Sequence, residues 1–217
     1  MATINRGILD GFFGKVGTVV GSFWKGIPVM RAYVRRIHDR KNNSQLLVRA
    51  RFTAISDLAS AFLSAIRIGL RNAASNSHTT EANVFVKKNW NAVQATTVDS
   101  VTIDYADLVV SKGALTSVQF GTAQFDTPQQ VDVAFDSNEE VDGTSLDDLV
   151  YLFVYCPDTK GGILSAPVKR SVKSISLMVP SYWNGMKVHL WGFTLGGDLF
   201  NAGTLSDSSY IGSGNIG

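Results

Sequence analysis

The chain has 217 residues, of which 45% are hydrophobic and 18% are charged, and this composition excludes global intrinsic disorder. Its length allows one large domain or two small ones. Residues 1–71 hold 12 lysines and arginines against 3 acidic residues, and residues 72–217 hold 8 against 15, so charges of +9 and −7 make up the net +2. Such a chain can attract its own copies head to tail, or bind a polyanion at its basic end.

Targeting and disulfide signals are weak in this sequence. The single cysteine, Cys156, cannot form an internal disulfide, and its place in an apolar run predicts a buried thiol. The first residues lack the apolar core of a signal peptide, and no stretch of about 18 apolar residues exists. We therefore expect a protein that is made in the cytoplasm and does not insert into membranes.

Residues 11–36, GFFGKVGTVVGSFWKGIPVMRAYVRR, are predicted to form a glycine-rich β-hairpin with its turn at Trp24-Lys25-Gly26. Val16, Thr18, Val20 and Ser22 alternate as in one strand. Glycine weakens a strand unless another backbone approaches closely, so the ribbon is expected to lie flush against either the rest of this chain or a neighbouring copy, with an unpaired edge. The residues predicted to self-associate are Gly14, Lys15, Val16, Gly17, Trp24, Lys25 and Gly26.

A polar, basic segment follows at residues 35–45, with Asn42-Asn43-Ser44 as a turn and candidate helix N-cap. Its charges could bind phosphate, and the alternative is a solvated connector. The candidate nucleic-acid contacts are Arg31, Arg35, Arg36, Arg40, Lys41 and Arg49.

Two helices are predicted next. Apolar residues recur at three- and four-residue spacing over residues 45–71, which predicts one long amphipathic helix. A loop at residues 72–80 ends in a capping Thr80, and a shorter helix runs from Glu81 to about Val93. The polar stretch 95–100 favours a boundary between an N-terminal domain, residues 1–98, and a C-terminal domain, residues 99–217.

From Val101 onward the hydrophobic period changes to that of strands, with turn signals between them. The strands are predicted at 101–105, 108–110, 116–125, 130–136, 149–155, 163–169, 172–179, 187–195 and 208–211. Val131, Val133, Phe135, Val188, Leu190 and Gly192 are expected to face inward, and His189 to face solvent. The expected fold class is α+β, in which the N-terminal hairpin and two helices precede an antiparallel β-sandwich of immunoglobulin or fibronectin type III topology.

Catalytic and metal-binding patterns are absent from the sequence. The three histidines, His38, His78 and His189, have no second ligand at metal-binding spacing, and no nucleophile elbow occurs, so we expect neither an enzyme nor a cofactor. Eight carboxylates between residues 126 and 148 suit calcium in kind, but Val141 stands where an EF-hand loop needs glycine, which favours a solvated acidic loop. They are Asp126, Asp132, Asp136, Glu139, Glu140, Asp142, Asp147 and Asp148.

Several short motifs resemble a family of Bacteroidota proteins catalogued only as a domain of unknown function. They are Gly14-Lys15-Val16-Gly17, Trp24-Lys25-Gly26, Arg31, Gln45, Ile103-Asp104-Tyr105, Ser111-Lys112-Gly113, Leu146-Asp147-Asp148 and Ser206-Asp207-Ser208-Ser209-Tyr210-Ile211-Gly212. The resemblance covers nearly the whole chain and implies no particular reaction.

The sequence therefore favours a structural protein whose copies assemble into a larger particle, a virion or a filament. The ribbon, the two electrical ends and the glycine-rich C-terminus, IGSGNIG, supply the parts for β-augmentation between copies. The alternative is a nucleic-acid-binding protein that uses the basic N-terminal region. A sandwich module that binds carbohydrate or protein also fits.

Overall fold

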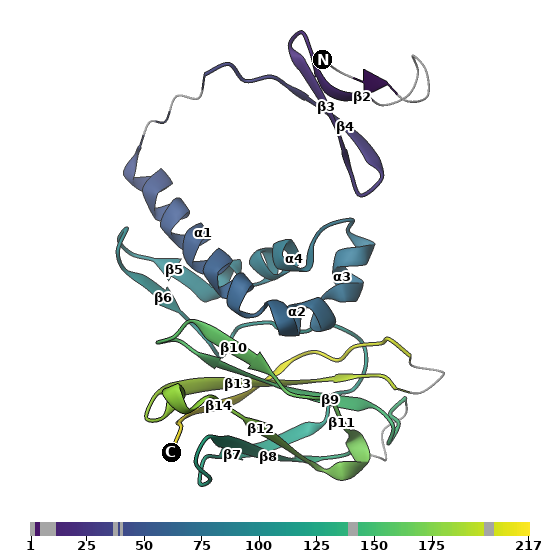
Figure 1. Cartoon of the computed structure of the whole chain (residues 1–217), viewed down its shortest axis with the longest axis vertical. Helices are drawn as coiled ribbons and strands as arrows, with labels where there is room; N and C mark the ends of the chain where they lie inside the picture. The colour runs from purple at the N-terminus through teal and green to yellow at the C-terminus, as the bar shows by residue number, and fades with distance from the viewer. Residues whose placement is uncertain (1–2, 5–11, 37–38, 40, 139–142, 198–201) are drawn as a thin grey trace. The chain divides into compact units, whose positions relative to one another are not determined.

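A computed structural model describes residues 3–4, 12–36, 39, 41–138, 143–197 and 202–217, in two compact units, Met1–Asn42 and Asn43–Gly217 (Figure 1). The fold class is α+β with mostly β content, as predicted. The boundary predicted between residues 98 and 99 falls inside the second unit, in a paired hairpin of β5 (Val93–Ala95) and β6 (Val101–Ile103). Each unit is described by itself.

The N-terminal unit is an antiparallel sheet of four strands, in the order β1 (Thr3–Ile4), β2 (Phe12–Val16), β3 (Val19–Trp24) and β4 (Ile27–Ala32). The predicted turn between β3 and β4 is confirmed. Its two central residues, Lys25 and Gly26, have φ values of 46° and 82°, the φ pattern of a type I′ turn. The single strand predicted across residues 16–22 is wrong, because Gly17, at φ 57°, begins a second turn.

Four helices open the second unit: α1 (Asn43–Ala61), α2 (Leu63–Gly69), α3 (Arg71–Asn76) and α4 (Glu81–Lys88). The single helix predicted over residues 45–71 is wrong, because the chain bends by 80° between α1 and α2. Phe62 stands at the bend and is fully buried against Phe85 and Phe153. The predicted cap is confirmed, since the Thr80 hydroxyl accepts a hydrogen bond from the Asn83 N–H at 3.3 Å.

Three short 3₁₀ helices interrupt the rest of the chain: η1 (Trp90–Ala92), η2 (Arg170–Val172) and η3 (Ser181–Trp183). The second predicted helix therefore ends at Lys88, before η1. The strand predicted at residues 108–110 is wrong, because the buried Asn89 side chain takes the place of a neighbouring strand. Its Oδ1 accepts from the Val109 N–H at 2.6 Å, and its Nδ2 donates to the Val109 carbonyl at 2.9 Å.

Two antiparallel sheets form the body of the second unit. The larger has the order β10 (Gly161–Leu164), β9 (Leu149–Cys156), β13 (Lys187–Leu195) and β14 (Ser209–Asn215), with β11 (Val168–Lys169) also paired to β9. The smaller has the order β12 (Ser174–Met178), β8 (Gln130–Asp136) and β7 (Gln119–Gln124). The strands predicted at 130–136 and 187–195 are confirmed at both ends.

The second unit has three layers, in which helices cover one face of the larger sheet and the smaller sheet covers the other (Figure 1). Phe62, Phe153 and Trp191 belong to the core under the helices, and Val133 and Leu190 to the core between the sheets. Because both faces of β9 and β13 are buried, these strands are apolar almost throughout. Cys156, on β9, is buried and free, as expected.

No single helix of the described chain is both long enough and apolar enough to span a membrane. Only α1 and α2 taken together have the length and apolar composition, and they are bent by 80°.

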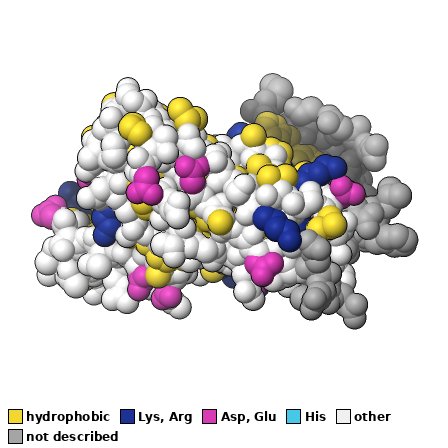
Figure 2. Space-filling model, turned by 90° about the horizontal axis from the view of Figure 1, so that it is seen from below, with side chains coloured by type: hydrophobic (Ala, Val, Ile, Leu, Met, Phe, Trp, Pro, Cys, Tyr) yellow, Lys and Arg dark blue, Asp and Glu magenta, His cyan; other side chains and the backbone are white. Residues whose placement is uncertain are grey.

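Figure 2 shows acidic and basic side chains scattered over one face of the molecule, without a gathering of one sign. The charge division of the sequence is therefore not visible as a single patch on this face.

Candidate functional site

One face of the N-terminal sheet is apolar. Cross-strand pairing places Gly14, Gly21 and Met30 side by side on this face, and Val16, Val19 and Ala32 beside them. Alternation along β3 and β4 brings Phe23 and Pro28 to the same side. We call this the apolar face: Gly14, Val16, Val19, Gly21, Phe23, Pro28, Met30 and Ala32. None of these residues carries a charge.

Most of the apolar face is exposed. Met30 is 70% exposed, Val16 55% and Phe23 44%, whereas Gly21 is buried against the Phe12 side chain. Among the described residues, neither hydrophobic core includes a residue of the N-terminal unit. Exposed apolar side chains gathered in this way are typical of an interaction surface.

The opposite face is mixed. Lys15, Val20 and Arg31 are paired across its three strands. The Lys15 Nζ lies 3.6 Å from the centroid of the Tyr33 ring, a cation–π contact. Trp24 shares this side by alternation along β3. We call this the basic face: Phe13, Lys15, Val20, Ser22, Trp24, Ile27, Val29 and Arg31 on the strands, with Tyr33 just beyond β4. Cationic and aromatic groups on one surface are suited to phosphates and bases.

The comparison with known families agrees with the resemblance predicted from the motifs. The model of a family of unknown function (DUF6266) matches residues 11–212. The chain belongs to this family. The match includes β2, β3 and β4, so the N-terminal sheet is part of what defines DUF6266 and not an addition to it. The expected Bacteroidota origin stays a prediction. No curated protein and no solved structure matches the chain.

The self-association residues predicted for this DUF6266 chain lie on different parts of the sheet. Gly14 and Val16 lie on the apolar face, Lys15 and Trp24 on the basic face, and Gly17, Lys25 and Gly26 in the two turns. Sequence reasoning missed Val19, Phe23 and Met30. The strand register puts these side chains on one surface. In the sequence, the alternation of residues along β4 was the signal that could have indicated this surface.

The unpaired ribbon edge predicted for β-augmentation falls on β4, an edge strand of the sheet, and its use stays a prediction. By contrast, β3 is paired on both sides, and the close approach at Gly21 is made by Phe12 of the same chain. β4 contains Pro28, which has no N–H. Because Trp24 and Ile27 close a two-residue turn, the Pro28 nitrogen faces outward, where it disfavours strand addition. The apolar face is therefore the better candidate surface.

The glycine-rich C-terminus, also predicted to pair with another copy, is used within its own chain. Residues 209–215 form β14, which is paired with β13 over six registered positions. Ile216 is buried in the core between the sheets. This segment therefore offers no free strand for augmentation along β13.

The candidate nucleic-acid contacts are divided between the two units. Arg31 lies on the basic face, Arg35, Arg36 and Lys41 are exposed beyond the sheet, and Arg40 lies outside the described residues. Arg49 belongs to α1 in the second unit, where it lines a groove. Arg31 shares its face with Lys15 and with Tyr33.

The prediction that His189 faces solvent is wrong. It is 7% exposed, its ring stacks on Tyr105 with centroids 4.0 Å apart, and its Nδ1 lies 2.8 Å from the Tyr210 hydroxyl. Helices cover this face of β13, which a simple alternation rule does not foresee. Burial, with a smaller contribution from Lys187, lowers the pKa of His189 to about 4. Among the described residues, no group of three potential metal ligands occurs.

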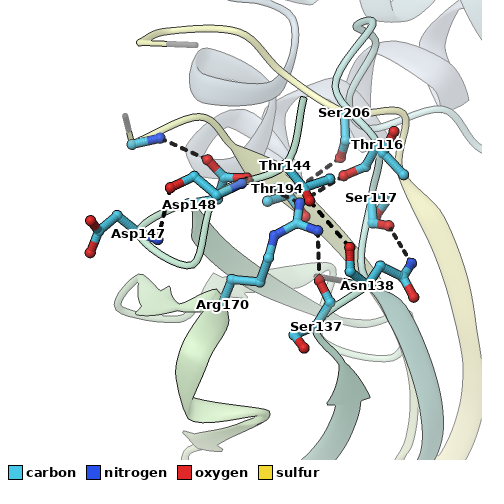
Figure 3. A network of polar contacts seen from close by, with 12 residues as sticks. Thr116, Ser117, Ser137, Asn138, Thr144, Asp147, Asp148, Arg170, Thr194 and Ser206 are labelled. Atoms are coloured by element: carbon cyan, nitrogen blue, oxygen red, sulfur yellow. Dashed lines mark hydrogen bonds and ion pairs between the residues drawn. The ribbon is translucent and has the colours of Figure 1, made fainter. Parts of the chain in front are cut away.

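The acidic segment is partly explained by a buried ion pair (Figure 3). The Arg170 guanidinium donates to the carbonyls of Ser137 and Thr116, at 2.9 and 2.7 Å. Asp148 pairs with it and accepts from the N–H groups of Ser145 and Gly197, at 3.0 and 3.2 Å. The carboxylate of Asp148 is therefore the counterion of the Arg170 guanidinium. Exposed Asp147 pairs with Lys169, and Glu139, Glu140 and Asp142 lie outside the described residues.

Proposed function

We propose that this protein is a non-enzymatic structural subunit that self-associates through the apolar face of its N-terminal sheet and builds a larger particle, a virion or a filament. The observation that carries the proposal is the exposure of Val16, Phe23 and Met30, which belong to neither hydrophobic core of the described chain. Their burial against a second copy would remove them from water, which is the main favourable term in protein association.

The magnitude of this contact favours repeated assembly over an isolated pair. Complete burial of one valine, phenylalanine or methionine side chain contributes about 1.5–3 kcal/mol. The side chains of Val16, Val19, Phe23 and Met30 are 55%, 37%, 44% and 70% exposed, which together amounts to about two fully exposed side chains. Their burial gives roughly 3–6 kcal/mol, while association costs about 4–15 kcal/mol in lost freedom and ordering. One contact is therefore weak, and a particle gains stability because each subunit makes the contact more than once.

The second unit would supply the rigid body of the subunit. Its two packed antiparallel sheets support a sandwich, and we propose the immunoglobulin or fibronectin type III topology for it as the finer description. A body of this kind keeps its shape while the N-terminal sheet makes the contact between copies.

Size-exclusion chromatography with light scattering tests the proposal on three forms of the complete chain. Met30→Lys places a charge on the apolar face and is expected to abolish association. The control is Val29→Lys, the adjacent position on β4, which points to the opposite face and is also exposed. If the two variants associate equally, the apolar face is not the contact surface.

The alternative function is nucleic-acid binding, and the basic face favours it because Lys15, Arg31 and Tyr33 share one surface. Phosphate contacts weaken with salt, so Arg31→Ala should lower the affinity for single-stranded DNA and reduce the slope of log K against log salt by about 0.7. An affinity of the wild type that does not vary with salt would exclude this function.

A further inference from the structure

A groove runs along α1 in the second unit, with a volume of about 480 Å³. One wall is a row of residues spaced four apart on α1, namely Leu46, Ala50, Ala54 and Leu58. Residues four apart lie on the same side of a helix, so the small alanines leave a hollow along it. The other wall comes from Val98, Ile103 and Tyr155. The groove is thus a mainly apolar hollow, with Arg49, Asp57 and Lys160 as the charged residues of its lining.

The two units carry opposite charge. Residues 1–42 hold 8 lysines and arginines against 2 acidic residues, and residues 43–217 hold 12 against 16, so the charges are +6 and −4. Two N-terminal sheets that met face to face would bring +6 against +6. A sheet that met the second unit of another copy would bring +6 against −4. Electrostatics therefore favours the unlike pair and opposes the like pair.

The charged side chains at the groove nearly cancel. Asp57 lines it together with Arg49 and Lys160, and Lys160 pairs with Asp57 at 3.5 Å. A second cavity is lined by Lys87 and Lys88 without an acidic residue, so the groove along α1 repels a basic sheet less than that cavity does.

We propose that the α1 groove of one copy receives the apolar face of the N-terminal sheet of a second copy. This inference rests on the proposed function and names the surface that the sheet contacts. Met30, the most exposed residue of the apolar face, is flexible and unbranched, and it enters the groove. Because two different surfaces meet, each copy keeps one of each free, and copies add head to tail into a ring or a filament.

A mixing experiment with two complete chains tests the contact. Met30→Lys disables the sheet and leaves the groove, whereas Val98→Lys disables the groove and leaves the sheet. Val98 is 50% exposed, so the change should not unfold the chain, and Leu46→Lys is a second groove variant. The matched control is Val172→Lys, at a valine that is 55% exposed and does not line the groove.

The expected result is that each disabled variant is a monomer, that Val172→Lys assembles as the wild type does, and that a mixture of Met30→Lys and Val98→Lys forms a 1:1 dimer in sedimentation velocity. The dimer forms because the mixture contains one intact sheet and one intact groove. If both groove variants assemble as the wild type does, or if the mixture stays monomeric, the groove is not the partner surface. A monomeric wild type would instead remove the proposed function, and the inference with it.

Discussion

The guanidinium of Arg170 lies 3.2 Å from the carboxylate of Asp148, and neither side chain is exposed to solvent. The pair joins η2 to the segment before β9, and its further bonds reach Thr116 and Ser137, which border β7 and β8. Residues 22 positions apart in the chain therefore tie the larger sheet to the smaller one. Burial lowers the pKa of Arg170, and Asp148 opposes this shift.

Asp148→Asn is expected to destabilise the protein by about 3–5 kcal/mol, because it leaves the buried charge of Arg170 without its counterion. Asp147→Asn is the matched control, since Asp147 forms its ion pair with Lys169 in solvent, where such pairs contribute about 0–1 kcal/mol. Urea unfolding, followed by circular dichroism, measures both. Equal midpoints for the two variants would show that the buried pair does not hold the sheets together.

Stability is expected to fall as the pH is lowered from about 6.5 towards 4, because of His189. Its folded pKa of about 4 lies below the ordinary value of 6.5, so the unfolded chain binds a proton in this range and the folded chain does not. The free energy of unfolding therefore rises with pH across this window and is independent of this group above it. His189→Asn should flatten the curve between pH 5 and 6.5, above the range where most carboxylates titrate. An unchanged slope in the variant would contradict the assignment.

A disulfide trap is expected to join the apolar face to the groove. Cys156 is buried, so it does not compete with cysteines introduced at the surface. Under mild oxidation, Met30→Cys mixed with Val98→Cys should give more dimer on a non-reducing gel than Val29→Cys mixed with Val98→Cys, because Val29 points to the basic face. If Met30→Cys alone gives the most dimer, the sheets meet each other instead of the groove.

Most strands were predictable because period-two alternation and turn residues are local signals. The errors arose where tertiary structure decides. Hydrophobic spacing continues through Phe62, so it does not reveal the bend that keeps α1 and α2 over the sheet. The alternating sequence pattern also continues through Gly17 and Thr18, so it does not reveal the two-residue turn between Val16 and Val19. His189 alternates as a surface residue does, but a helical layer covers its face of β13.

The association segment stays a prediction, and its faces could be predicted only in part. Glycines and aromatic residues in residues 11–36 indicated an association segment, but the sequence was interpreted as one hairpin where the chain forms a meander. The apolar face depends on which residues of β2, β3 and β4 stand opposite one another, and that register follows from two two-residue turns, of which only Lys25-Gly26 was recognised. The partnership of Asp148 with Arg170 is likewise invisible in the sequence, because it is set by the packing of two sheets.

The central claim is that copies of this chain associate, and the molar mass of the complete wild-type chain tests it most directly. Light scattering after size exclusion, at roughly 10–100 μM, samples the range in which a contact of micromolar strength is populated. The account predicts a mass that is a multiple of 23.5 kDa and rises with concentration. A mass of 23.5 kDa at every concentration would contradict it.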